Sequence, residues 1–343
     1  MKRPPTAALL FAMMLPLLLS LPLGAAAQVA APDPGPAPAA CVSILAKPFD
    51  GGLDPRIEPD CDSVAFYFGI GRDKDYAMAR SCALIERINH VEAKDNSPFP
   101  GAGILSMAYA NGDGGPRDIA LARRFVCENK EAATSETAAR LELLDKIEKA
   151  PQTAGRYSLC SVATTSLTLG WCATLELRVA DAKRYDEMVA IVDKLSPAGV
   201  EAFKKLQTTE GDYEAARAQK EIDLTGAART VWVLQEQDRV RTQFVSDLKL
   251  FSKPGYSQPV TLAVVDAAVN KDYNSIRVNG ARLFQGTTIT VAGVDETQAA
   301  WVKYRDAWRA YEGVVNPTVS SDAVATQIER ERLTQLHKLN TMY

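Results

Sequence analysis

Histidine is scarce in this 343-residue chain, and no Cys-x-x-Cys pair occurs. The two histidines, His90 and His337, lie far apart and away from every cysteine. Zinc sites usually combine closely spaced Cys and His ligands, so we expect no metal and no other cofactor. Neither histidine has a triad-like or Glu-x-x-His setting, which general base or nucleophilic catalysis would favour. The sequence therefore favours a protein that is not an enzyme.

Carboxylates offer the alternative catalytic chemistry. The chain has 42 acidic residues, and a glycosidase needs two carboxylates across its substrate. Asp113 or Glu296 with a neighbour would provide such a pair. In a chain with this many carboxylates, however, most such pairs lie on solvated helix faces. A cell-wall hydrolase is thus a weaker alternative than a binding protein.

The chain also lacks a large excess of either charge. Its formal net charge is −3, and removal of Lys2 and Arg3 with an N-terminal segment would leave 37 basic against 42 acidic side chains. This mild acidity argues against nucleic acid as a partner and favours encounter with a basic protein.

Long apolar runs are absent except at the N-terminus. Lys2 and Arg3 precede an apolar run over 7–23, which ends in Gly-Ala-Ala-Ala-Gln. This pattern predicts a signal peptide over 1–27, cleaved near Ala27, rather than a retained anchor, because prolines interrupt the run. A Pro- and Ala-rich linker and lead-in then covers 28–57. We expect a periplasmic or secreted protein with no membrane span after cleavage.

Six cysteines remain in the exported chain, an even number that predicts disulfides in an oxidising compartment. Fifteen connectivities are possible, and the sequence does not choose among them. Four cysteines precede residue 150 and two follow it, so pairing within each group is the simplest expectation. The specific prediction joins Cys41 to Cys61, Cys82 to Cys127, and Cys160 to Cys172. The last pair requires a bend near Thr164 or Thr165, because a straight helix would hold its ends about 18 Å apart.

Two stretches, 65–80 and 108–123, are similar at a spacing of 43 residues. Each has an apolar helix that ends at Gly-x-Gly, where glycine can adopt the positive φ of a helix C-cap. Asp75 and Asp118 are then placed to cap the next helix. A helix over 135–149 would cover the end of such a repeat. The glycines do not form a dinucleotide-binding motif, because each pair follows a helix and no third glycine is in place.

These hairpins resemble Sel-one-like repeats, which have an apolar Tyr-x-x-Gly-x-Gly followed by Asp and a basic-Ala pair. The resemblance is closer in the second copy than in the first. It implies a helical repeat domain over 58–152 that serves as a scaffold for a protein partner.

Helical periodicity continues through 155–343. Trp301, Tyr304, Ala307 and Trp308 form one helical stripe, and such a stripe is usually core. Only the stretch 281–292, rich in Thr, allows a short strand or extended loop to compete with helix. We therefore expect an all-α chain.

The motif Gln-x-x-Trp-x-x-Tyr-Arg-Asp resembles the lysozyme-inhibitor LprI family of exported, cysteine-containing helical domains, over about 158–340. The residues that carry the motif are Asn270, Tyr273, Gln298, Trp301, Tyr304, Arg305, Asp306 and Arg330. The stretch from Cys160 to Cys172 resembles the opening motif of that family. Trp308 departs from it, since the family commonly has a cysteine there. The resemblance implies stoichiometric binding of a lysozyme-type muramidase, with a structural or adaptor scaffold as the alternative.

The C-terminal part also matches itself at an offset of 91 residues, which suggests diverged copies over 158–250 and 260–343. Five identities fall in register: Gln207 and Gln298, Tyr213 and Tyr304, Arg239 and Arg330, Arg241 and Arg332, Leu248 and Leu339. The first copy is degenerate, because Glu210 stands at the position of Trp301 and Glu214 at that of Arg305. A linker over 252–259 separates the copies.

Overall fold

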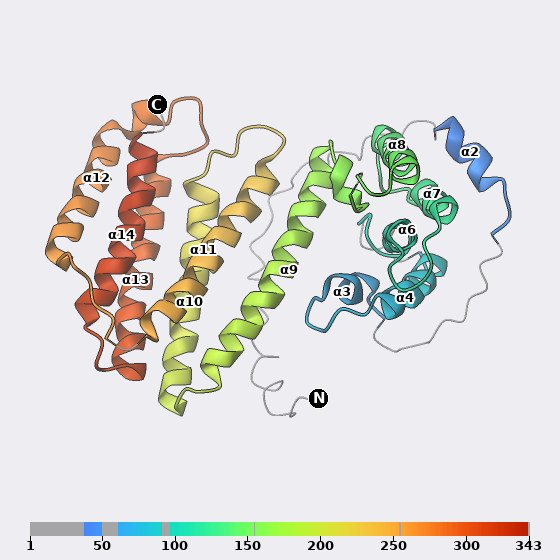
Figure 1. Cartoon of the computed structure of the whole chain (residues 1–343). Helices are drawn as coiled ribbons and strands as arrows, with labels where there is room; N and C mark the ends of the chain where they lie inside the picture. The colour runs from blue at the N-terminus through green and yellow to red at the C-terminus, as the bar shows by residue number, and fades with distance from the viewer. Residues whose placement is uncertain (1–37, 50–60, 91–96, 154, 254, 342–343) are drawn as a thin grey trace. The chain divides into compact units, whose positions relative to one another are not determined.

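The computed structural model describes residues 38–49, 61–90, 97–153, 155–253 and 255–341. Within them the chain forms twelve α-helices, one 3-10 helix and no strand (Figure 1). The all-α prediction is confirmed for these residues. The predicted signal peptide lies outside them. The part of the lead-in that is described contains a short helix.

The N-terminal helices are short and are joined by tight turns. They are α2 (Ala39–Leu45), α3 (Ser63–Phe68), α4 (Tyr76–Ile88), α6 (Ala102–Asn111), α7 (Ile119–Glu128) and α8 (Thr134–Lys149). Helix α3 packs on α4, α4 on α6, α6 on α7 and α7 on α8. The helix predicted over 135–149 is thus present as α8.

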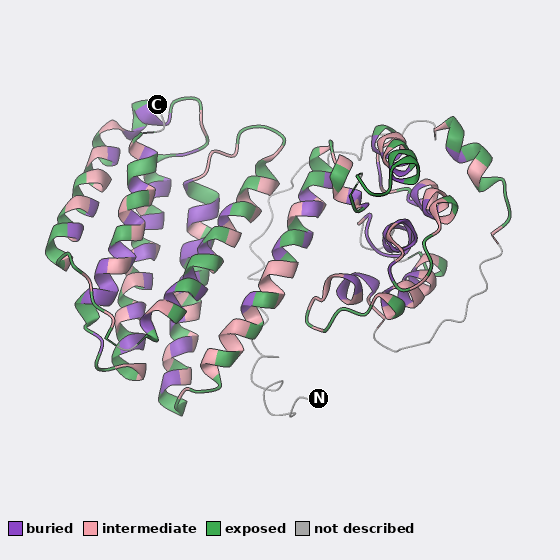
Figure 2. Cartoon of the chain, in the orientation of Figure 1, coloured by how far each residue is buried: buried purple, intermediate pink, exposed green. Residues whose placement is uncertain are grey.

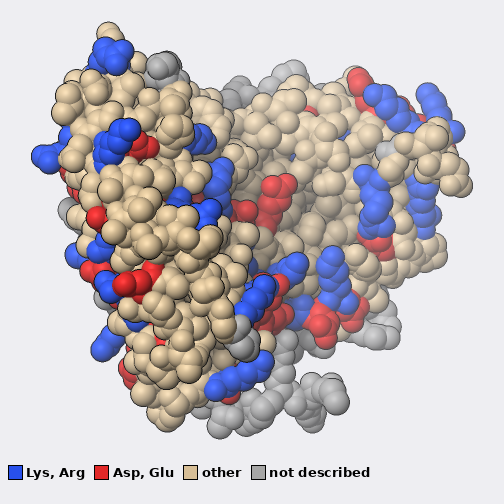
Figure 3. All heavy atoms as spheres, turned by 60° about the vertical axis from the view of Figure 1, so that its left-hand side comes forward, with Lys and Arg blue, Asp and Glu red and all other residues tan. Residues whose placement is uncertain are grey.

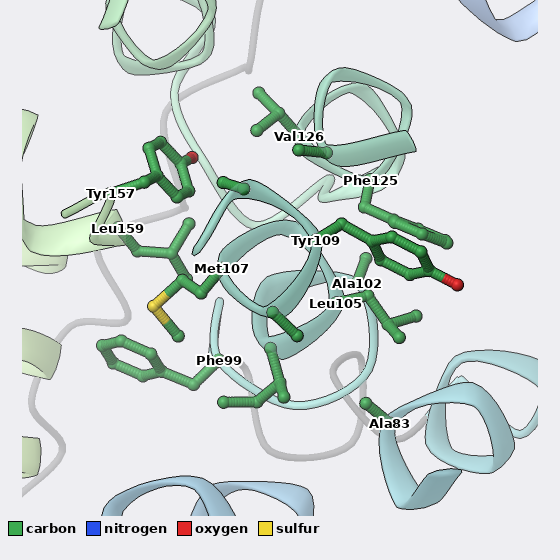
Figure 4. Close-up of a cluster of buried hydrophobic side chains, with 14 of the residues drawn as sticks. Ala83, Phe99, Ala102, Leu105, Met107, Tyr109, Phe125, Val126, Tyr157 and Leu159 are labelled. Carbon is green, nitrogen blue, oxygen red and sulfur yellow. The ribbon is translucent and has the colours of Figure 1, made fainter. Parts of the chain in front are cut away.

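Helix α6 lies at the centre of the first hydrophobic core (Figure 4). Its residues from 102 to 110 are all buried, as expected for a helix that is apolar on every side. Tyr109 stacks on Phe125 of α7, with ring centroids 5.5 Å apart. Phe99, Met107 and Leu159 gather on another side of α6. The core therefore surrounds one helix on several sides.

The two predicted hairpins share their turn geometry at a spacing of 43 residues. Gly69 and Gly112 both end a helix with φ near 75°. The amide of Asp75 donates to the carbonyl of Phe66, and that of Asp118 donates to the carbonyl of Tyr109.

Each of these aspartates also caps the following helix. The carboxylate of Asp75 accepts from the amide of Met78, and that of Asp118 accepts from the amide of Leu121, both at 2.9 Å. The predicted caps are confirmed. Ala79 and Ala122, each the fourth residue of its helix, are fully buried.

The C-terminal helices are long and lie side by side (Figure 1). After a 3-10 turn at Leu159–Val162 come α9 (Ser166–Val192), α10 (Pro197–Lys220), α11 (Arg229–Phe251), α12 (Leu262–Leu283), α13 (Val291–Val315) and α14 (Ser321–Asn340). Helix α9 packs on α11, α12 on α14, and α10 on α13. Buried residues follow the helix faces directed toward neighbouring helices (Figure 2). A second hydrophobic core lies among them.

Helix α9 contributes to both cores. Cys172 and Leu175, near its start, belong to the first core, whereas Met188 and Ile191, near its end, pack against the second. Glu136 of α8 secures its start, because its buried carboxylate accepts from the amides of residues 164 and 165 at 2.7 Å each. The first core thus extends beyond residue 155.

The predicted connections in the C-terminal part are present as loops. Helix α11 ends at Phe251 and α12 begins at Leu262, which places the predicted linker between them. Non-helical residues from 284 to 290 separate α12 from α13. Of the two possibilities for the Thr-rich stretch, the loop is therefore the one observed.

Three disulfides are present, and one predicted pair is confirmed. Cys160 is bonded to Cys172, and the chain bends before α9 with Thr165 as its N-cap. The pairs Cys41–Cys61 and Cys82–Cys127 were wrong. The structure instead joins Cys41 to Cys127 and Cys61 to Cys82. The reason is packing: α2 lies against α7, which brings residues 86 apart in sequence within bonding distance.

Candidate functional site

The motif residues of the C-terminal part do not converge on one site. Trp301 and Tyr304 are core residues, with exposed fractions of 2% and 3%, as predicted. Tyr273 donates to Asp295 at 2.6 Å, which links α12 to α13. Asn270 donates to Asp266 within α12.

The arginines of the motif form links between elements. Arg305 donates to Glu329 of α14 at 2.8 Å and to Asp306 at 3.0 Å. Arg330 donates to Gln258, in the loop between α11 and α12, at 3.1 Å. The motif therefore stabilises contacts between helices in this part of the chain.

Arg332 is the centre of a buried ionic network. Its guanidinium donates to Gln298 at 2.8 Å and to both carboxylate oxygens of Glu221 at 2.7 and 2.8 Å. Arg217 donates to Glu221 at 2.5 Å and to Glu236 at 2.6 Å. Burial alone would raise the pKa of Glu221, but the two guanidinium groups lower it below its usual value. This network joins α10, α11 and α14.

A second ionic cluster links α9, α10 and α11. Arg241 forms a bidentate pair with Glu214, at 2.6 and 2.9 Å, and donates to Asp181 at 2.5 Å. Arg184 donates to Asp181 at 2.8 Å and to Asp238 at 2.7 Å. Each arginine therefore already has carboxylate partners.

Glu210 of α10 lies beside this cluster without joining it. Its side chain is 7% exposed, and its Oε1 atom has no hydrogen-bond donor among the described residues. Burial, together with the negative charge of Glu214, raises the pKa of Glu210 to about 8, although Arg241 opposes the shift. Glu210 is thus mostly protonated at neutral pH.

Glu210 lines a cavity of about 480 Å³ formed by α9, α10, α11 and the turn that follows α3. That turn contributes Ile70 and Gly71, and the apolar part of the helical wall comes from Ala182, Tyr185, Met188, Phe244 and Val245. The remainder is polar, from Arg178, Asp181, Arg184, Gln207, Glu210 and Arg241. A volume of this size and a few polar groups in an apolar wall are typical of small-molecule sites. We take this cavity as the candidate functional site.

Three of the positions 91 residues after cavity residues carry bulky hydrophobic side chains. Trp301 corresponds to Glu210, Ile276 to Tyr185 and Leu336 to Val245. These three residues are buried in the second core. At these three positions the earlier residue of each pair lines the cavity and the later one belongs to the hydrophobic core.

The sequence motifs did not identify this site. In the sequence, Glu210 is distinguished only because an acid stands where the 91-residue register has Trp301. That difference is the one sequence signal for the site. Of the two carboxylates considered for catalysis, Asp113 accepts from Arg156 at 2.6 Å and from Tyr67, which links the turn after α6 to other segments. Glu296 forms a half-exposed pair with Lys220. Neither lines the cavity.

On the face seen in Figure 3, Lys and Arg side chains are interspersed with Asp and Glu, and no large patch of a single charge is present. None of the described helices has both the length and the apolar character that a bilayer crossing requires.

Comparison with protein family models, with curated proteins and with solved structures found no match.

Proposed function

We propose that this chain is an exported binding protein of the cell envelope, periplasmic or secreted, that associates stoichiometrically with a protein partner. The observation that carries the proposal is the recurring hairpin geometry at 43-residue spacing, with paired Gly turns and Asp caps. That geometry supports Sel-one-like repeats in α3–α4 and α6–α7, and such repeats serve as partner scaffolds. Three disulfides are consistent with an oxidising compartment.

We also propose that α9–α11 and α12–α14 are diverged copies of one unit. Helices α9 and α12 end 91 residues apart, at Val192 and Leu283, and the packing of α9 on α11 matches that of α12 on α14. Tyr213 and Tyr304, which correspond in this register, stack with centroids 5.2 Å apart. A residue that contacts its own counterpart is expected where two equivalent units meet about a two-fold axis.

The partner that the LprI-like motif implies is a lysozyme-type muramidase. The test is to titrate muramidase activity with the disulfide-bonded chain from residue 28 onward. We expect activity to fall to a plateau near a fixed molar ratio, with weaker association at higher salt because exposed charges are screened. The full chain is needed, since α9 belongs to both cores. Unchanged activity at large excess would exclude the inhibitor hypothesis.

The alternative is an adaptor scaffold that binds another envelope protein through the repeats. It predicts capture of a defined envelope partner and no effect on muramidase. Gly114→Ala, a substitution in the second Gly-x-Gly turn, would then reduce capture of that partner. Hydrolysis of peptidoglycan by the purified chain alone would contradict both forms of the binding proposal.

A further inference from the structure

The buried carboxyl of Glu210 lacks the partner that such a group normally has. Buried polar groups are almost always hydrogen-bonded, because an unpaired one costs free energy. Among the described residues no donor reaches its Oε1 atom, and the side chain faces a cavity large enough for a small molecule. A ligand with N–H donors would satisfy it.

The surroundings of Glu210 favour a positively charged ligand. Arg184 and Arg241 are held by three carboxylates, those of Asp181, Glu214 and Asp238, at 2.5 to 2.9 Å. Arg178, Asp181 and Asp238 are all partly or fully exposed, so solvent and salt screen their charges. The strongest charge acting on Glu210 is the negative one of Glu214 on the same helix. An added cation is therefore better accommodated than an added anion.

The apolar part of the cavity wall favours an apolar ligand body. Met188, Phe244 and Val245 contribute hydrocarbon, thioether and aromatic surface there. Aromatic faces attract cations, and a thioether adapts to varied shapes. At the offset of 91 residues the counterpart of Glu210 is Trp301, a bulky core residue.

We propose that the cavity between α9, α10 and α11 binds an organic cation with an apolar body, an alkyl- or arylammonium ion whose N–H groups donate to Glu210. Its hydrocarbon part contacts Met188 and Phe244. This small-molecule site goes beyond the proposed association with a protein partner. Neither depends on the other.

The test uses the disulfide-bonded chain and matched probes. Hexylamine and 4-phenylbutylamine carry the charge, whereas hexanol, 4-phenylbutanol and 4-phenylbutanoate are neutral or anionic analogues. Titration calorimetry and NMR shifts at pH 8 should show at least tenfold tighter binding of an amine than of its analogues, at one site per chain. Equal binding of amine and alcohol, preference for the carboxylate, or no binding of either amine at millimolar concentration would overturn the proposal.

Two substitutions locate the site. Glu210→Gln keeps the shape but removes the charge and should weaken amine binding at least tenfold. Glu210→Trp introduces the residue found at position 301 and should abolish binding by filling the cavity. Glu201→Gln, on the exposed side of the same helix, is the matched control and should bind as the native chain does. Retained binding in Glu210→Gln would overturn the proposal even if the Trp variant fails to fold.

The pH dependence gives an independent readout. The cation binds the ionised carboxylate, and the pKa of Glu210 is about 8, so affinity should rise up to about tenfold per unit between pH 6 and 8 and then level off. Binding at pH 7 should release a proton. The charged and titratable groups around Glu210 are Glu214 on its own helix and, from the packed helices, Arg178, Asp181, Arg184, Tyr185, Arg241 and Tyr304. The pKa of Arg241 and that of Tyr304 are both raised, away from this range. A pH-independent affinity would contradict the role of Glu210.

Discussion

At the scale of single residues, Trp301 and Glu210, 91 residues apart, are both buried but have different surroundings. Trp301 is a buried core residue whose face is covered by the guanidinium of Arg305, 5.2 Å from its ring centroid. Glu210, in the same register, is a buried acid at a cavity. Both lie on the side of their helix directed into the protein, so exposure does not distinguish them. What differs is whether neighbouring side chains fill the space.

Trp301→Ala tests the packing role. Removing a fully buried indole leaves a cavity that the surrounding helices fill only in part, so we expect a loss of about 3 to 5 kcal/mol in the free energy of unfolding. Urea unfolding followed by circular dichroism measures it. Lys303→Ala, exposed on the same helix, should change stability by less than about 0.5 kcal/mol. An unchanged midpoint for Trp301→Ala would make the stripe a surface feature.

At the scale of elements, the two Gly-x-Gly turns are alike in conformation but different in surroundings. Gly71 and Gly114 both have φ near 70°. A Cβ atom on Gly114 would come within 2.3 Å of the carbonyl oxygen of Tyr76 at the start of α4, whereas one on Gly71 would meet nothing within 4 Å. The second turn thus packs against the backbone of the preceding hairpin.

This difference predicts unequal effects of the same substitution. Gly71→Ala should cost only the conformational penalty of the left-handed region, about 1 kcal/mol. Gly114→Ala must also displace backbone and should cost about 3 kcal/mol or more. Thermal unfolding of the two variants under oxidising conditions compares them directly. Equal losses would mean that the hairpins do not pack through this turn.

At the scale of the whole molecule, several buried acids make stability depend on pH. Burial raises the pKa of Glu312 to about 7, that of Asp247 to about 7 and that of Glu210 to about 8. The folded state therefore holds protons that the unfolded state has lost above about pH 4.5, and stability declines as pH rises through these values. Glu221 has the opposite shift, and its contribution is lost as pH falls below its usual range.

We therefore expect the highest melting temperature near pH 5 and a decline toward pH 8. Glu312→Gln removes one of the acids whose ionisation is penalised, so it should flatten the decline by about 2 to 3 kcal/mol at pH 8. Melting curves at both pH values measure this. Glu201→Gln should keep the native pH profile. A decline of the same size in Glu312→Gln and the native chain would show that Glu312 is not responsible.

Much of the local structure was predictable because its causes are local. Helical periodicity, Gly-x-Gly turns and Asp caps act over a few residues, so the hairpins, α8, the bend before α9 and the buried Trp301 and Tyr304 followed from the sequence. The Cys160–Cys172 bond also spans a short segment that the family resemblance marked. The cavity at Glu210 was not predicted, since a helical pattern alone shows which face is inward but not how completely it is filled.

The sequence by itself therefore determined an all-α chain, the turns and caps of its hairpins, and the residues available for disulfides and core. Only the tertiary structure decided how the first four cysteines pair, because the packing of α2 on α7 brings together two cysteines that are 86 residues apart in the sequence. It also decided that α9 belongs to both cores and that Glu210 faces an unfilled space. These features depend on how the helices pack and on how completely their side chains fill the space between them. A local sequence pattern specifies neither.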